Sequence, residues 1–435
     1  MASRFTRSCS PEYGVSLPLR LRWRAAYAGV LSGLILFGFS LPAPSQMLIK
    51  PAEPGDPVTI MPADLAIFES ADERKELPCV VTQRNANLGF DLRFHAGYDV
   101  TLPLQEVSGD GELLTVVFRV SSRGEQGQSA YFVQHFNVPT VADDAKGDAV
   151  LQGEINLGEG DYHVDWLMRD RTERICSSAW DVEASLSPKD RLINLFLAPN
   201  KVAEFQPEPF LNDTDVRNAP AGSEALNVKL LVNFAPQDSL SATLQKSDTD
   251  ALVSILKTIQ RDPRIGRISL VAFNMSESRV VYRQETADQI DFPALGRALR
   301  TVKLGTVRID QLNEKHSETD FLQSLIEHEV STPSAHPDAV IFAGPKAMLN
   351  ADVPQGDLRR IGDIECPVFY MNYNLNPQAV PWKDSISHAI KAFRGTEFTI
   401  SRPRDLWFST SDMVNRILRS KRSRPLTSTV SGGSR

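Results

Sequence analysis

The chain has 435 residues, of which 42% are hydrophobic and 23% charged. This composition excludes a collagen-like, coiled-coil or mostly disordered protein, and the length predicts two or three domains. The net charge is −7, but residues 1–45 and 416–435 are basic, which leaves 36 basic against 53 acidic residues in 46–415. So acidic a body repels a phosphate backbone, which argues against nucleic-acid binding.

Residues 25–41 form an uncharged, mainly apolar run that follows three arginines and precedes the sequence PAPSQ at 42–46. These are the parts of a secretory signal peptide, and we predict cleavage near Ser45 and Gln46. The alternative is an uncleaved anchor, because about 17 apolar residues can just span a bilayer. In both cases residues 1–45 direct export, and the protein is expected to be secreted or periplasmic, with membrane contact only through this segment if it is retained.

Three cysteines lie beyond the leader. Cys79 and Cys176 fall within one predicted domain and could form a disulfide in an oxidising compartment, which would leave Cys366 over. The alternative is that all three are buried small hydrophobic residues. No two cysteines have C-x-x-C spacing, which argues against a redox or structural zinc site.

Residues 57–186 have the pattern of a β-sandwich domain. Short runs rich in β-branched and aromatic residues alternate with turn sequences; the runs are 113–120, 130–138, 150–157 and 162–168. The sequence LGEGDYHV at 157–164 resembles the tyrosine corner of immunoglobulin-like sandwiches, in which a phenol bonds to upstream backbone. The alternative is a plain hairpin whose Tyr162 is a core residue.

Residues 187–226 contain five prolines among polar residues and are predicted to be a linker. Within it, residues 192–197 could complete the preceding sheet. Residues 419–435 are basic and are predicted to be a disordered tail.

Between the linker and the tail, residues 227–418 alternate apolar strands with amphipathic helices. This alternation predicts an α/β domain with a doubly wound, mostly parallel sheet covered on both faces. Strands are expected at 228–232, 268–273, 339–343, 368–371 and 398–400, with 279–282 returning as a hairpin. Helices are expected after Ser247, at 292–299, and around the apolar stripes at 321–326, 386–393 and 413–418.

The order of these elements resembles a von Willebrand factor type A domain, and more narrowly the exported von Willebrand A-related proteins of acidobacteria. The resemblance covers 227–418 and rests on five sequences taken together. They are NVKLLVNF (227–234), RISLVAFNMSESRVVYR (267–283), HSETDF (316–321), DAVIFAG (338–344) and GTEFTISRPRDL (395–406).

The resemblance implies a divalent-cation site at the carboxyl ends of the strands, built from D-x-S-x-S, a distant Thr and a distant Asp. Here the first motif aligns with Asn233, Ala235 and Gln237, the threonine with Thr319, and the distant Asp with Gly344 or the next residue. A neutral amide offers no charge against the dehydration of Mg²⁺. We therefore predict a degenerate site with no metal and no cofactor, although Asp238, Ser239 and Ser241 could compensate through a shifted loop.

Catalytic motifs give little support to an enzyme. The sequence contains no H-E-x-x-H, no G-x-S-x-G and no phosphate-binding glycine loop. The run Glu327-His328-Glu329 lies on a predicted helix, where consecutive side chains diverge, so we interpret it as a solvent-exposed polar face.

We therefore expect an exported adhesion or scaffold protein that binds an unidentified protein partner at the strand ends, through Asn233, Asp238, Ser239, Ser241 and Thr319. The alternative is a secreted hydrolase that uses Asp238, Ser239 and Thr319 at the same edge. Only the hydrolase requires titratable groups to converge in one pocket.

Overall fold

The structure is a computed structural model. It describes residues 47–49, 60–70, 73–109, 111–124, 129–212, 225–237, 241, 244–302, 317–331, 337–349, 351–360, 366–375 and 384–423. The predicted leader and its cleavage site lie outside these residues. Within the described ranges, no helix has both the length and the apolar character that crossing a membrane requires.

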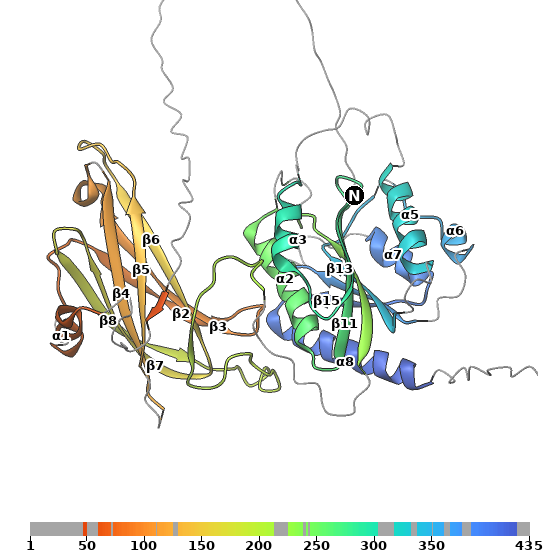
Figure 1. The fold of residues 1–435 in the computed structure, drawn as a ribbon, viewed down its shortest axis with the longest axis horizontal. Helices are drawn as coiled ribbons and strands as arrows, with labels where there is room; N and C mark the ends of the chain where they lie inside the picture. The colour runs from red at the N-terminus through yellow and green to blue at the C-terminus, as the bar shows by residue number, and fades with distance from the viewer. Residues whose placement is uncertain are drawn as a thin grey trace, which may run out of the picture. The chain divides into compact units, whose positions relative to one another are not determined.

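The N-terminal part is built from two antiparallel sheets (Figure 1). One sheet has the order β1-β5-β4-β7-β8 and the other β2-β3-β6-β9. The strands are β1 (Met47–Ile49), β2 (Val80–Leu88), β3 (Phe94–Pro103), β4 (Glu112–Ser122), β5 (Ser129–Val138), β6 (Asp148–Leu157), β7 (Gly160–Arg169), β8 (Ile175–Ala184) and β9 (Val202–Glu204). A helix, α1 (Pro62–Ser70), and a 3-10 turn (Leu104–Val107) complete this part.

A core with a large aromatic content fills the space between the two sheets. It draws Tyr98 from β3, Phe118 from β4 and Trp166 from β7, each at most 2% exposed. Tyr98 packs edge-on against both of the other rings, at centroid distances of 5.8 and 5.4 Å. The four predicted strand runs correspond to β4, β5, β6 and β7, because their alternating apolar residues face this core.

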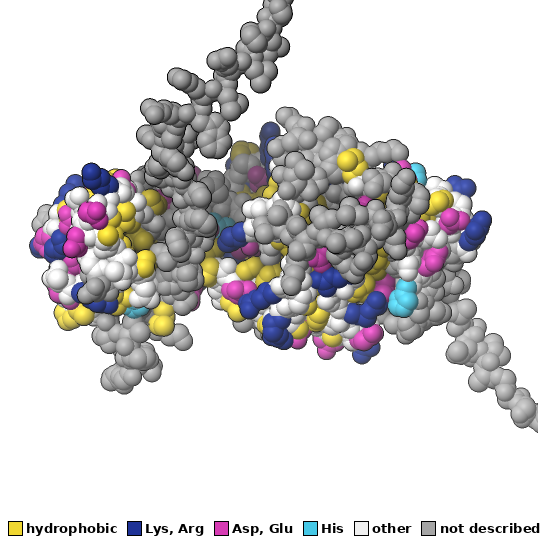
Figure 2. Space-filling view, turned by 90° about the horizontal axis from the view of Figure 1, so that it is seen from above, with side chains coloured by type: hydrophobic (Ala, Val, Ile, Leu, Met, Phe, Trp, Pro, Cys, Tyr) yellow, Lys and Arg dark blue, Asp and Glu magenta, His cyan; other side chains and the backbone are white. Residues whose placement is uncertain are grey.

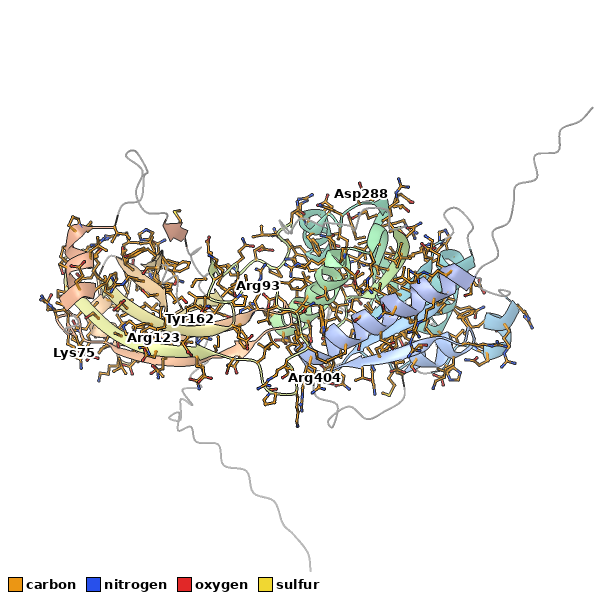
Figure 3. All side chains as sticks on the ribbon, turned by 90° about the horizontal axis from the view of Figure 1, so that it is seen from below. Lys75, Arg93, Arg123, Tyr162, Asp288 and Arg404 are labelled. Carbon is orange, nitrogen blue, oxygen red and sulfur yellow. A yellow bond between two sulfur atoms is a disulfide. The ribbon has the colours of Figure 1, made fainter. Side chains whose placement is uncertain are left out.

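The phenol of Tyr162 bonds to backbone as predicted. It is fully buried and donates to the carbonyl oxygen of Gly158 at 2.9 Å, with the carbonyl oxygen of Lys201 at 3.2 Å. Tyr162 lies among the strands of the N-terminal part (Figure 3). A single hydroxyl thus joins the start of β7 to the segment that leads into β9.

The sequence left two states open for Cys79 and Cys176, and the structure joins them in a disulfide. Cys79 immediately precedes β2 and Cys176 lies in β8, so the bond connects one sheet to the other. Cys366 is not part of this bond.

The predicted linker is partly wrong. Residues 192–197 form no strand, and Leu192 is 74% exposed; instead β9, farther along the same segment, pairs with β6. The reason is a turn that follows Pro199, in which Asn200 has a φ of 58° and Lys201 accepts from the amide of Gly158 at 2.8 Å. Residues 213–224 lie outside the described ranges.

The C-terminal part contains a mixed six-stranded sheet in the order β12-β11-β10-β13-β14-β15. Four neighbouring pairs are parallel and the β11–β12 pair is antiparallel. The strands are β10 (Leu226–Asn233), β11 (Ile265–Asn274), β12 (Arg279–Ala287), β13 (Ala339–Gly344), β14 (Val368–Tyr373) and β15 (Thr396–Ile400). The predicted hairpin is the β11–β12 pair.

Helices cover both faces of this sheet (Figure 1). They are α2 (Lys246–Arg261), α3 (Phe292–Leu299), α5 (Ser317–Ser331), α6 (Gln355–Arg360), α7 (Ser385–Lys391) and α8 (Pro403–Ser423). One hydrophobic core lies between the sheet and α2, α3 and α8, and a second lies between the sheet and α5, α6 and α7. Both faces of β13 and β14 are therefore buried, which explains their continuous apolar sequences.

The bounds predicted for two helices in this part need correction. Helix α2 begins one residue before Ser247, because Gln245 and Asp248 form a capping box. Helix α8 continues to Ser423, five residues into the predicted disordered tail, and Lys421 bonds to Asp338 at 3.0 Å. Residues 424–435 lie outside the described ranges.

The polar face predicted for Glu327-His328-Glu329 is wrong for its last residue. The Glu329 side chain is 2% exposed and forms ion pairs with Lys229 on β10, at 2.7 Å, and with Arg283 on β12. Lys229 and Arg283 of the sheet thus hold the carboxylate of Glu329 in a buried position. Helical periodicity alone does not predict this burial.

Candidate functional site

The candidate site lies at the carboxyl ends of β10 and β13, where Asn233 and Gly344 meet. β10 and β13 pair in parallel up to Val232 and Ala343, so the next residue of each strand is adjacent to the other. A Cβ atom built on Gly344 would lie 2.7 Å from the Cβ of Asn233. The two positions that the sequence singled out on separate strands are therefore in contact.

The Asn233 side chain is fully buried and forms a hydrogen bond with the end of the neighbouring strand, β11. Its Oδ1 accepts from the amide of Met275 at 3.1 Å, while its Nδ2 has no hydrogen-bond partner among the described residues. Asn274 at the end of β11 acts similarly: its Nδ2 donates to the carbonyl oxygen of Phe234 at 2.6 Å, and its Oδ1 accepts from the amide of Glu277. Neutral amides hold these two strand ends together.

Gln237, one of the residues that the sequence analysis aligned with the D-x-S-x-S pattern, connects two loops. Its Nε2 donates to Oδ1 of Asn374 at 3.2 Å, and its Oε1 accepts from the amide of Leu375 at 3.0 Å. Gln237 follows β10 and Asn374 follows β14, so this pair passes across the end of β13, which lies between them. Ala235, at the first serine position, is buried and supplies no polar group.

Another buried amide, Asn372, lies one strand farther along, on β14. Asn372 is opposite Gly344 in the β13–β14 register, and its Nδ2 donates to Oε1 of Glu397 on β15 at 3.0 Å. The next residue, Tyr373, donates from its phenol to Asp248 on α2. Burial, followed by the hydrogen bond to Asp248, raises the pKa of Tyr373 far above its usual range, so the phenol stays neutral.

Asp384 is a buried carboxylate at this edge. It caps the N-terminus of α7, accepting from the amide of Ile386 at 3.1 Å, and it also accepts from the amide of Ala347 in the loop after β13, at 3.2 Å. Burial raises the pKa of Asp384 to about 6, even though the bond from Ala347 lowers it. The carboxylate therefore joins α7 to the β13 loop.

Thr319 lies on α5 and binds the same loop farther along. Its hydroxyl donates to the carbonyl oxygen of Ala351 at 2.8 Å, and the residue is 7% exposed. Asp352, the residue after Ala351, accepts a hydrogen bond from the Ser385 hydroxyl at 3.1 Å. Thr319 thus holds the loop after β13, and its described contacts do not include Asn233.

The remaining predicted residues divide into two groups. Ser241 is described, and its hydroxyl accepts from Nε2 of Gln245 ahead of α2, at 3.0 Å. Asp238 and Ser239 lie outside the described residues. The structure therefore brings Asn233 and Gly344 together, attaches Thr319 to the β13 loop and leaves Ser241 with the start of α2.

Sequence reasoning missed Asp384, Asn372 and Asn374. A signal was available for Asp384, because an aspartate directly before a helix is a typical N-cap. Asn372 and Asn374 carry no local signal, since their role depends on partners from other strands.

The chemistry of the site depends on which oxygen atoms are free to bind a ligand. The Asn233 amide oxygen is already used by the Met275 amide, and the Asp384 oxygen that is bonded accepts from two backbone amides. Mg²⁺ requires octahedral oxygen ligands that include charged carboxylates. The described residues at this edge thus form hydrogen bonds that fix loops, and the amides of Asn233 and Gln237 take part in them.

Comparison with known proteins adds little. No protein-family model matches the chain, and no curated protein matches it. Among solved structures, the PilB minor pilin from Streptococcus sanguinis has a TM-score of 0.27 at 9% identity, covering 74% of this chain and 91% of the pilin. The Bacteroides uniformis beta-glucuronidase has a TM-score of 0.17 at 11% identity, covering 79% of this chain and 31% of the enzyme. Likenesses this low carry no functional conclusion, so the function is inferred from the site.

Proposed function

We propose that this is an exported protein-binding protein of the adhesion or scaffold type. Its C-terminal part would be a von Willebrand A-like domain without a working metal site, and its N-terminal part an immunoglobulin-like sandwich. The observation that carries the proposal is the sheet order β12-β11-β10-β13-β14-β15, antiparallel only at the β12 edge, with Asn233 and Gly344 in contact at the strand ends. Open α/β sheets bind ligands at that edge.

The surface around this edge supports a protein partner. Met348 in the loop after β13 is 65% exposed and Leu375 after β14 is 36% exposed. Exposed apolar side chains beside fixed loops are suited to contact with another protein. In the view of Figure 2, basic and acidic side chains are interspersed over the described surface, as expected for a protein that does not bind a polyanion.

A hydrolase is less well supported by the same residues. A nucleophilic hydroxyl needs a neighbouring base, but the Thr319 hydroxyl donates to a backbone carbonyl oxygen. The binding function requires no such base.

The partner can be tested by affinity capture from the envelope fraction of the source organism with the mature chain. We expect a reproducible protein partner whose recovery is unaffected by EDTA. It should be lost with the double variant Met348→Arg and Leu375→Arg and retained with Val150→Arg, since Val150 is 59% exposed but lies on β6. Recovery of no partner, or loss of the partner on chelation, would contradict the proposal.

The metal part of the proposal has a separate test. Calorimetric titration of the mature chain with Mg²⁺, Mn²⁺ and Ca²⁺ should give no binding heat. The triple variant Asn233→Asp, Ala235→Ser and Gln237→Ser, which restores the D-x-S-x-S pattern, serves as the comparison. Micromolar binding by the unmodified chain would show that the site is not degenerate.

A further inference from the structure

The N-terminal part has an edge strand, β8, whose outer side lies beside a groove. β8 is the last strand of its sheet and β2 is the first strand of the other. The Cys79–Cys176 disulfide links these two edges, with the Cα atoms 6.3 Å apart. Edge strands have backbone groups on one side that no neighbouring strand of the sheet uses.

The hydrogen bonds of β8 define which residues point outward. The carbonyl oxygen of Ile175 accepts from Leu77, and the amide of Ser177 donates to Arg74, so these two residues face away from β7. The β7–β8 register is regular from Gly160 to Arg169. Because backbone direction alternates along a strand, residues 179, 181 and 183 also present their N–H and C=O groups to the open edge.

These outward groups are not used within the described chain. The segment Arg74–Leu77 pairs with the first residues of β8, after which Pro78 and Cys79 direct the chain into the other sheet. No backbone hydrogen bond to the outer side of residues 179, 181 or 183 occurs among the described residues. Beside them lies a groove of about 440 Å³, lined by residues 83–86 of β2 and residues 180–183 and 185 around β8.

The opposite wall of the groove, strand β2, lacks a regular open edge. The β2–β3 register shifts between Arg84 and Asn87, and such a bulge interrupts the regular edge that another strand needs. β8 has no such interruption over its ten residues. Of the two edges, β8 is therefore the one on which an added strand can form regular hydrogen bonds.

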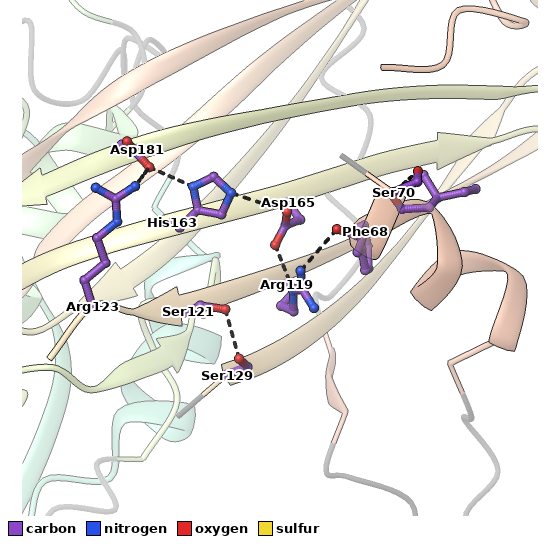
Figure 4. A network of polar contacts seen from close by, with 10 residues as sticks. Phe68, Ser70, Arg119, Ser121, Arg123, Ser129, His163, Asp165 and Asp181 are labelled. Carbon is purple, nitrogen blue, oxygen red and sulfur yellow. Dashed lines mark hydrogen bonds and ion pairs between the residues drawn. The ribbon is translucent and has the colours of Figure 1, made fainter. Parts of the chain in front are cut away.

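The charge around β8 indicates the kind of strand. Asp181 is bonded to Arg123 at 2.6 Å and to His163 at 2.7 Å (Figure 4). Glu183 and its register partner Asp161 are both exposed, and neither forms an ion pair within the described chain.

Among the described residues that line the groove, the one cation is already engaged. Arg84 donates to the carbonyl oxygen of Gly153 at 2.8 Å and lies 3.5 Å from Asp99. The charge left available beside the groove is thus negative.

We propose that the open edge of β8, residues 179–183, binds an extended segment of a protein partner that adds as a further strand. The segment carries basic side chains at alternate positions, one of which meets Glu183 and Asp161. Backbone hydrogen bonds would supply affinity and the acidic pair would supply selectivity. This surface is independent of the strand-end site in the C-terminal part.

The free edge can be tested first by amide hydrogen exchange, measured by NMR on the mature chain. The amides of residues 179, 181 and 183 should exchange rapidly, while those of 178, 180 and 182, which face β7, should be protected. Slow exchange at 179, 181 and 183 would mean that these groups are already bonded, and the proposal would fail.

Binding is tested with an acetylated heptapeptide of alternating lysine and valine, compared with its glutamate–valine counterpart. The lysine peptide should bind and should protect the amides of 179, 181 and 183; the glutamate peptide should not. Equal binding of both peptides, protection elsewhere, or no binding of the lysine peptide at millimolar concentration would overturn the proposal.

Two variants locate the contact. Ala179→Pro removes one outward N–H without removing a bond to β7. It should lower the affinity for the lysine peptide by about tenfold. If that variant does not fold, Glu183→Lys tests the same contact, because it should also lower the affinity for the lysine peptide by about tenfold. In the matched control, Asp148→Lys, the same charge change lies on the exposed start of β6 in the other sheet, and the affinity and the protection pattern at 179, 181 and 183 should survive. Unchanged affinity in both β8 variants would place the peptide elsewhere.

Discussion

Asn233 and Gly344 are in direct contact, because a Cβ atom on Gly344 would lie 2.7 Å from the Cβ of Asn233 and 3.0 Å from its carbonyl oxygen. Gly344 also has a φ of 153°, which side-chain-bearing residues rarely adopt. The end of β13 thus requires glycine for two reasons, the close approach of Asn233 and the positive φ.

This contact predicts the effect of Gly344→Ala. The substitution should lower the free energy of unfolding by about 2 to 4 kcal/mol, because it combines a backbone clash with an unfavourable φ. The matched control is Gly356→Ala on α6, where a new Cβ would meet nothing within 4 Å. The control should be neutral or up to about 1 kcal/mol stabilising. Urea denaturation of both variants measures the difference, and equal stabilities would contradict the packing at the strand end.

The buried phenol of Tyr162 makes a second prediction. Tyr162→Phe removes the donor to the Gly158 and Lys201 carbonyl oxygens and should cost about 1 to 2 kcal/mol. Tyr282→Phe is the comparison, because the Tyr282 hydroxyl is partly exposed and its bond to Gln284 is 3.3 Å long. That change should cost less than about 0.5 kcal/mol. If both variants melt alike, the Tyr162 hydroxyl does not hold the start of β7.

The buried carboxylate of Glu329 should be important for stability. Burial alone would raise its pKa, but the hydrogen bonds and charges of Lys229 and Arg283 outweigh burial and lower the pKa below its usual value. Glu329→Gln leaves two cations without their partner and should cost about 3 kcal/mol at pH 7.

The pH dependence of that cost has a defined sign. Because the pKa of Glu329 is lowered in the folded state, its contribution is complete above about pH 4.5 and is lost as the pH falls through the folded pKa. The stabilities of the unmodified chain and Glu329→Gln should therefore converge in acid. A difference that stays constant from pH 7 to pH 3 would argue against the ion pairs.

Asp384 should show the opposite pH dependence. Burial raises its pKa to about 6, so between pH 4 and 6 the folded state holds a proton that the unfolded state has lost. The free energy of unfolding therefore falls as the pH rises through this window. Asp384→Asn keeps an N-cap acceptor for α7, removes this dependence, and should be more stable than the unmodified chain by on the order of 1 kcal/mol at pH 7. Parallel pH–stability curves for the two proteins would refute the assignment.

The disulfide predicts sensitivity to reductants. Cys79 and Cys176 are 97 residues apart in sequence, and closing so long a loop is worth about 4 to 5 kcal/mol in the chain-entropy model. Adding dithiothreitol should lower the melting temperature of the unmodified chain to that of the variant Cys79→Ser and Cys176→Ser. The variant itself should not respond to dithiothreitol. A melting temperature unaffected by reduction would mean that the bond contributes little.

The sequence by itself determined the elements that depend on neighbouring residues. Apolar runs identified β4 to β7 and the six strands of the C-terminal sheet, since strand and helix periodicities are properties of consecutive residues. The sequence also singled out Tyr162 as a phenol that bonds to upstream backbone, and Asn233 and Gly344 as the residues at the ends of β10 and β13. Strand β3 was missed because His95 and Gly97 interrupt its apolar pattern.

Only the tertiary structure decided which polar groups are buried and which edges stay open. Glu329 is held inside by cations on two strands, and Gln237 bonds to Asn374 across β13. The outer edge of β8 is open at residues 179–183 because the chain turns away after Cys79. Each of these outcomes depends on a partner far away in the sequence. Local patterns encode a residue's preference for strand or helix, whereas the burial of a charge and the freedom of an edge depend on what the folded chain brings beside it.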